Sequence, residues 1–184
     1  MAEYYLISQL PSLDSVSYNT PLSIDEERFF ELCSQFLRKK AQNEIEKLTL
    51  LPPAEPEQNY SRLLSDWYEG ERNLRFALAK VRAEKMNKSF ELENEQLPEK
   101  LLKVANEAAN AENPFEAEII LYDYRMSFLE SLRPMDAFAE DYLFYYGLKL
   151  KLIMRMKRFD KELGEAAYKN IYSSILSGDR MEAL

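Results

Sequence analysis

The sequence predicts an all-α protein, a helical bundle of about six to seven helices. Glycine occurs only four times among 184 residues, and valine and isoleucine are sparse beside leucine, glutamate, lysine and alanine. That composition favours helices over strands. Apolar residues also recur at spacings of three and four along most of the chain, which is the period of an amphipathic helix. Proline and capping residues separate these segments and mark where helices begin and end.

Residues 134–159 contain the longest apolar and aromatic stretch and are predicted to form the central helix. Pro134 suits the start of a helix, and the carboxylate of Asp136 can serve as N-cap for the first turn. Two neighbouring apolar rows predict burial on more than one side. One row consists of Phe138, Tyr142, Tyr145, Leu152, Met156 and Phe159, and the other of Leu143, Tyr146, Leu150 and Ile153.

The second half of this stretch carries five basic residues, although the whole chain has a net charge of −8. They are Lys149, Lys151, Arg155, Lys157 and Arg158. Acidic residues come first and basic residues last, an order that complements the helix dipole. These cations are either solvated and salt-bridged, or they dock on an acidic partner or an anionic membrane surface. So many charges are too costly for a transmembrane span.

The N-terminal part of the chain begins with an apolar patch, residues 4–10, that fits a short extended strand or one to two helical turns. Its two tyrosines suggest a docked terminus. Ser23 and Glu26 then form a capping box that opens the first clear helix. The apolar face of this helix is Phe29, Phe30, Cys33, Phe36 and Leu37. A second helical segment is expected over residues 42–51, before a proline-rich linker at 52–57.

A long amphipathic helix is predicted over residues 58–87, followed by a polar loop at 88–97. Gly70 lies inside this helix, where glycine costs about 1 kcal/mol relative to alanine. Such a glycine fits either a kink or a close helix crossing. The apolar face consists of Tyr60, Leu64, Trp67, Leu74, Leu78 and Val81.

Two prolines mark the following helices. Pro98 suits the first position of a helix that reaches about residue 110. Asn113 and Pro114 supply the N-cap and first residue of the next helix. Its apolar residues have a heptad-like spacing that predicts a packing seam: Phe115, Ile119, Tyr122, Met126 and Leu129.

A last helix is expected after Asp160 as N-cap, with Gly178 as its stop. Its apolar face would be Leu163, Ala167, Ile171, Ile175 and Leu176. The chain is interpreted as a single helical domain over residues 1–184. The alternative is two lobes, residues 1–51 and 58–184, joined by the linker at 52–57.

The residue types available argue against catalysis. The chain has no histidine, which removes the commonest general base and every histidine metal site. It contains no phosphate-binding glycine motif and no paired cysteines. Glu91, Glu93 and Glu95 alternate without the spacing of a calcium loop. The three central tyrosines are interpreted as core packing with hydroxyls at the surface: Tyr142, Tyr145 and Tyr146. We therefore expect no enzyme activity, no cofactor and no metal.

Charge and cysteine content bound the setting of the protein. A net charge of −8 argues against a nucleic-acid partner, which needs a basic footprint. Cys33 is the single cysteine and is expected to be a buried small hydrophobe. The first residues lack a signal-peptide pattern, and no apolar run reaches 18 residues. These features predict a cytoplasmic protein.

Three stretches resemble one bacterial family of unknown function that is encoded inside V-type ATPase operons. They are Tyr4-Tyr5-Leu6-Ile7-Ser8-Gln9-Leu10-Pro11, then Asn113-Pro114-Phe115-Glu116-Ala117-Glu118, and finally residues 142–159 with their GLKLKLIMRMKRF ending. The family is distantly similar to the C-type subunit of V-type ATPases, known as the d-type subunit in eukaryotes. That protein is an all-helical adapter that seats the central stalk on the proteolipid ring.

This resemblance implies a non-enzymatic coupling component at the cytoplasmic face of the membrane. Its partners would be stalk and proteolipid-ring subunits, and the five basic residues of the central helix would face acidic groups of a partner. Two alternatives come from other classes. One is a general helical interaction module, such as a homodimer, with no rotary role. The other is a hydrolase or lyase that uses carboxylates and tyrosines in a bundle cavity.

Overall fold

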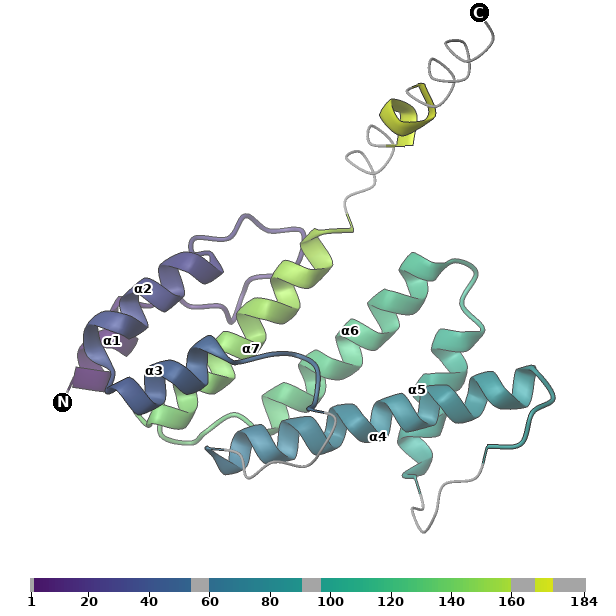
Figure 1. Cartoon of the computed structure of the whole chain (residues 1–184), viewed down its shortest axis with the longest axis horizontal. Helices are drawn as coiled ribbons and strands as arrows, with labels where there is room; N and C mark the ends of the chain where they lie inside the picture. Colours follow the sequence, from purple (N-terminus) through teal and green to yellow (C-terminus); the bar gives the residue numbers. More distant parts are fainter. Residues whose placement is uncertain (1, 54–59, 91–96, 160–167, 174–184) are drawn as a thin grey trace, which may run out of the picture.

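The computed structural model of the chain describes residues 2–53, 60–90, 97–159 and 168–173. These residues contain α-helices and no β-strand, so the predicted all-α fold is confirmed (Figure 1). The helices are α1 (Ala2–Gln9), α2 (Glu26–Phe36), α3 (Lys39–Glu46), α4 (Arg62–Lys85), α5 (Glu99–Ala109), α6 (Pro114–Ser131) and α7 (Glu140–Lys157). Residues 168–173 are also helical.

Helix α7 lies at the centre of the fold and contacts α2, α4 and α6 (Figure 1). Every residue from Leu143 to Leu150 is buried. The prediction of a helix buried on more than one side is therefore confirmed. Gly147 permits the approach of the N-terminal helices, because a Cβ at this position would lie 2.7 Å from Leu48 Cδ2 and 3.1 Å from a Phe29 ring carbon.

Two apolar clusters form the core. The larger one joins α7 to the N-terminal helices, and Phe29 and Tyr146 pack in it with ring centroids 5.4 Å apart. The smaller one lies between the second half of α4, α5 and α6, and contains Leu74, Ala105 and Leu121. Residues on both sides of the proline-rich linker contribute to the larger cluster.

The crossing of α4 and α6 depends on a glycine and a buried ion pair. A Cβ at Gly70 would overlap the Phe128 ring, so the close-crossing interpretation of this glycine is the one observed. Arg125 lies one turn before Phe128 on α6. It donates from Nε and Nη2 to the two carboxylate oxygens of Glu71, both at 2.8 Å. Arg75 also contacts Glu71, at 3.3 Å. This charge pair fixes one helix against the other.

The N-terminal helices differ from the prediction in their caps and bounds. Asp25, not Ser23, is the N-cap of α2, and its carboxylate accepts from the backbone N–H of Arg28. The predicted capping box is wrong because Glu26 pairs with Lys151 of α7 instead. Helix α3 covers Lys39–Glu46, so the predicted bounds of about 42–51 are wrong at both ends. Its C-cap is Lys47, whose backbone N–H caps the last turn by donating to the Asn43 carbonyl.

Helix α7 begins later than predicted, at Glu140, and its N-cap is Ala139. The predicted N-cap role of Asp136 is wrong, because its carboxylate accepts from the Phe138 N–H in a local turn. Pro98 is the N-cap of α5 rather than its first residue. The cap of α6 is confirmed, since the Asn113 side chain accepts from the Glu116 N–H at 2.9 Å.

The apolar patch at the N-terminus forms the helix α1, which is one of the two predicted alternatives. Leu6 is fully buried and docks this helix, whereas Tyr4 and Tyr5 are exposed. The docked terminus is thus confirmed, although the leucine and not the tyrosines provides the anchor.

Several predictions lie outside the described residues. They concern residues 54–57 of the linker, the glutamates Glu91, Glu93 and Glu95, and the last helix at Asp160, Leu163, Ala167, Ile175, Leu176 and Gly178. The helical residues 168–173 belong to the predicted last helix, and their side chains are exposed. None of the helices in the described ranges is long and apolar enough to cross a membrane.

Candidate functional site

The five basic residues of α7 and its end do not form one surface. Lys149 lies in the core with 5% of its side chain exposed. Lys151, Arg155 and Lys157 are half-buried, and Arg158 is exposed. A helix turns by about 100° per residue, so neighbours in sequence face different parts of the protein. The ion pairs that each residue forms within the chain therefore decide which of the five can still bind another molecule.

Lys149 is the centre of a polar network that ties the N-terminal loop to α6 and α7. Its Nζ donates to Glu130 Oε1 at 2.6 Å, to Asp14 Oδ1 at 3.1 Å and to the Tyr145 hydroxyl at 3.2 Å. The Tyr145 hydroxyl donates to Glu130 Oε1 at 2.7 Å. Arg133 adds two hydrogen bonds to Asp14, at 3.2 and 3.3 Å. All these contacts lie within the chain, so Lys149 already has its acidic partners.

The pKa values of Lys149 and Tyr145 fit a structural role for this network. Burial lowers the pKa of Lys149, but hydrogen bonds to Glu130, Tyr145 and Asp14 outweigh it and raise the pKa well above its ordinary value. Burial and the hydrogen bond to Glu130 raise the pKa of Tyr145 to about 12. Lys149 therefore stays charged and Tyr145 stays neutral near pH 7.

The predicted position of the central tyrosine hydroxyls at the surface is wrong for two of the three residues. The Tyr145 hydroxyl is part-buried against Glu130, and the part-buried Tyr146 hydroxyl donates to the Pro11 carbonyl at 2.9 Å. Burial raises the pKa of Tyr146 as well. Because these hydroxyls sit beside acceptors inside the fold, they hold the N-terminal loop and α6 on α7.

Two further cations pair with acidic residues of other helices. Lys151 is ion-paired with Glu26 at the start of α2, and its ammonium lies 5.4 Å from the centre of the Phe30 ring. Arg155 Nη2 lies 3.0 Å from Glu118 Oε2 of α6. These pairs attach α7 to α2 on one side and to α6 on the other.

Lys157 and Arg158 form no side-chain ion pair with any described residue. Within the described part of the chain, they are therefore the two basic residues of the predicted cluster that have no acidic partner. Arg158 also lines a cleft of about 450 Å³, whereas Lys157 lies outside its lining.

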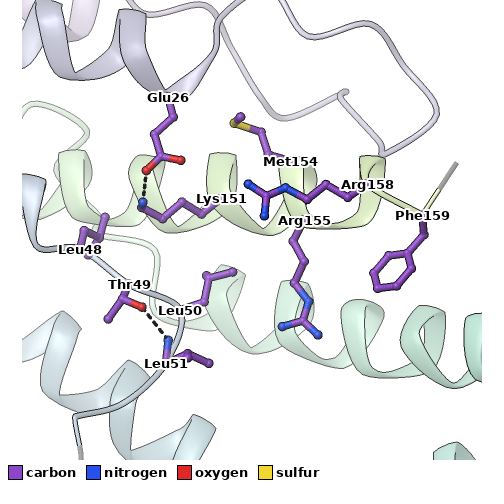
Figure 2. Close-up of a pocket in the computed structure, with 10 residues that line it drawn as sticks. All are labelled: Glu26, Leu48, Thr49, Leu50, Leu51, Lys151, Met154, Arg155, Arg158 and Phe159. Carbon is purple, nitrogen blue, oxygen red and sulfur yellow. Dashed lines mark hydrogen bonds and ion pairs between the residues drawn. The ribbon is translucent and has the colours of Figure 1, made fainter. Parts of the chain in front are cut away.

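The cleft lies between the start of α2, the segment after α3 and the end of α7 (Figure 2). Arg155 and Arg158 provide guanidinium groups on its α7 side, and Figure 2 shows the Arg158 side chain lying back along α7 toward Met154. Leu51 and Phe159 are its exposed apolar residues. The full lining is Glu26, Leu48, Thr49, Leu50, Leu51, Lys151, Met154, Arg155, Arg158 and Phe159.

The chemistry of this lining suits binding. Glu26 is the one carboxylate among the ten described lining residues, and it is ion-paired with Lys151. Most glycoside hydrolases place two carboxyl groups around the bond that they cleave, whereas the described lining of this cleft supplies one. No three acidic or cysteine residues within the described ranges are placed to hold a metal ion. The cleft instead combines positive charge with apolar surface.

The sequence patterns did not identify the cleft wall formed by residues 48–51, because this segment was predicted to be helical. They also missed an exposed aromatic patch, which we define as Tyr4, Tyr5 and Phe138. Tyr4 and Phe138 have ring centroids 4.6 Å apart, and Tyr4 and Tyr5 have theirs 6.0 Å apart. The paired tyrosines at the start of the chain were the available signal, but they were interpreted as the docking contact.

Comparisons with known proteins found no relative of this chain. No protein-family model matches the chain, and neither the curated proteins nor the solved structures contain a significant match.

Proposed function

We propose that this protein is a non-enzymatic helical adapter whose α7 cleft binds acidic and apolar groups of a protein partner. The observation that carries this proposal is Arg158, an exposed cation without an ion pair to a described residue, next to the exposed side chains of Leu51 and Phe159. On a chain with a net charge of −8, such a site attracts an acidic segment while most of the surface repels it.

The residue types around the cleft fit a protein interface. Arginine and aromatic residues are enriched among the side chains that contribute most to binding. Lys151 and Arg155 hold the cleft walls through their pairs with Glu26 and Glu118, so they shape the site. Arg158 and Phe159 are the groups that a partner contacts directly.

The partner in this proposal is a bacterial V-type ATPase, at its central stalk and proteolipid ring. The three stretches that resemble the operon-encoded family support this choice, and so does the all-helical fold. A coupling component must transmit torque, which requires extended contacts with charged and aromatic anchors. The protein then works at the cytoplasmic face of the membrane.

Affinity purification from the native host, with detergent-solubilised membranes, tests this proposal. The wild-type bait should recover stalk and proteolipid-ring subunits at near-stoichiometric yield. The Lys157→Glu/Arg158→Glu variant should lose most of this recovery, since neither residue has an ion pair to a described residue. The matched control is Lys100→Glu/Lys103→Glu on α5, which makes the same charge change at exposed positions.

Three results would change the proposal. Recovery of no ATPase subunit by a folded bait would remove the V-type ATPase as partner. Recovery restricted to assembly intermediates, below stoichiometry, would indicate an assembly factor. Equal losses in the two variants would show that total charge matters and the cleft does not.

Self-association is the second candidate function, and the aromatic patch of Tyr4, Tyr5 and Phe138 favours it. All three rings are exposed, and an exposed apolar patch often marks an interface. Sedimentation of the wild type and of Tyr4→Ser/Phe138→Ser decides this point. A dimer that the double substitution converts to a monomer would support the interaction module, and a monomeric wild type would eliminate it.

A further inference from the structure

The α7 cleft and the helical residues 168–173 present complementary surfaces within one chain. Tyr168 and Tyr172 lie one turn apart with ring centroids 6.0 Å apart and planes 14° from parallel, and they are 68% and 55% exposed. In the cleft, Leu51 and Phe159 are 49% and 43% exposed. Each surface therefore leaves apolar area in water that the other can cover.

We propose that the two tyrosines of residues 168–173 dock into the α7 cleft of the same chain and compete with the partner for it. This inference rests on the proposed function, since it assigns the regulation of the same site. In this proposal the chain has an undocked state, in which Tyr168 and Tyr172 are exposed as they are in the structure, and a docked state in which both tyrosines fill the cleft.

The connection between the two surfaces is short enough for docking within one molecule. Phe159 lines the cleft and precedes Tyr168 by nine positions. Nine residues span at most about 30 Å when extended and about 13 Å as a helix. A tether of this length gives an effective concentration on the order of millimolar. Even a weak contact is then populated in competition with a dilute partner.

Charge and side-chain chemistry favour the same occupant. Residues 160–165 contain three acidic residues and one basic residue, and they closely follow Lys157 and Arg158. Inside the cleft, Arg158 can lie over a tyrosine ring in a cation–π contact. Met154 also lines the cleft (Figure 2), and a methionine sulfur makes favourable contacts with aromatic rings. Tyrosine also keeps its hydroxyl at the open side of such a site.

Disulfide trapping in the full-length chain tests the docking. Thr49→Cys/Ser173→Cys places one thiol on the cleft and one on the C-terminal helix, and it keeps both tyrosines and the apolar cleft residues. The native Cys33 is 1% exposed and does not interfere. The control is Met86→Cys/Ser173→Cys, because Met86 follows the end of α4, is 62% exposed and is not among the residues that line the cleft. We expect the cleft pair to form an intramolecular disulfide at least roughly tenfold faster. Equal rates, or disulfide-linked dimers in place of the intramolecular product, would overturn the proposal.

The affinity purification measures the competition between the two tyrosines and the partner. Tyr168→Ser/Tyr172→Ser should increase recovery of the partner several-fold in the affinity purification, whereas unchanged recovery would overturn the regulatory role. If the bait recovers no partner, the proposed function fails, but the trapping rates still decide whether the tyrosines dock. The two failures are therefore distinguishable.

Discussion

The buried ion pair between Glu71 and Arg125 is predicted to be the most sensitive polar contact of the α4–α6 crossing. The side chains are 3% and 10% exposed, and the pair has two hydrogen bonds of 2.8 Å. Removing one partner of such a pair leaves a buried charge without compensation, which costs about 3–5 kcal/mol. Removing Arg125 should cost an amount near the lower end of this range, since Arg75 still contacts Glu71 at 3.3 Å. Loss of Glu71 should fall at the upper end.

Urea unfolding followed by circular dichroism measures these differences. We expect Glu71→Leu to lower the free energy of unfolding by about 5 kcal/mol and Arg125→Met by about 3 kcal/mol. The double variant should cost less than either single variant, because it removes both charges and fills the space with apolar atoms. An unchanged dependence of the free energy on urea would show that the folded and unfolded states keep their exposed area.

The pair Arg28–Glu31 provides a matched control. Its nitrogen and oxygen are also 2.8 Å apart, but its side chains are 58% and 54% exposed. Neutralising Glu31 should cost below about 1 kcal/mol, as for other exposed pairs. If Glu71→Leu costs no more than this control, or if the two buried substitutions simply add, burial is not what makes the pair important and the reasoning is refuted.

Three further predictions concern the core and the network. Gly147→Ala should lower the free energy of unfolding by about 1–3 kcal/mol, since the new Cβ would lie 2.7 Å from a core methyl group; a gain in stability would contradict the observed close packing. The Lys149 hydrogen bond lowers the pKa of Asp14 below its ordinary 3.8. Burial raises the pKa of Glu130, but hydrogen bonds from Lys149 and Tyr145 outweigh it and hold the pKa below its ordinary 4.5. Because both folded-state pKa values are lowered, the stability that they contribute is present above these ordinary values and is lost as pH falls through the lowered ones. Urea midpoints should therefore drop at acidic pH, less so in Asp14→Asn/Glu130→Gln. Finally, burial raises the pKa of Cys33 to about 12, so alkylation at pH 8 should be far slower in native protein than in urea, and equal rates would show an open core.

Local signals in the sequence predicted the helices and much of the core. The two apolar rows of the central helix indicated burial on several sides, and Leu143 and Ile153 are indeed fully buried. Asn113 and Pro114 were sufficient to place the start of α6. These predictions succeed because caps and helical periodicity depend on residues a few positions apart. The cap at Ser23 failed because Asp25 competes for the same role two positions later.

The candidate site was only partly predictable. The sequence showed five cations together, but Lys149 pairs with Asp14, 135 positions away, and Lys151 with Glu26, 125 positions away. No local pattern contains such partners. Only after these pairs are assigned does Arg158 stand out as a cation without a partner among the described residues.

Composition and short-range spacing were enough to predict the helical class and the central apolar helix, because both are properties of the chain. Which cations pair internally and where the cleft lies became clear from the packed fold. Both depend on contacts between segments that are distant in sequence, such as Leu51 and Phe159 around the cleft. Their geometry exists only when the helices are packed, because packing sets which faces meet.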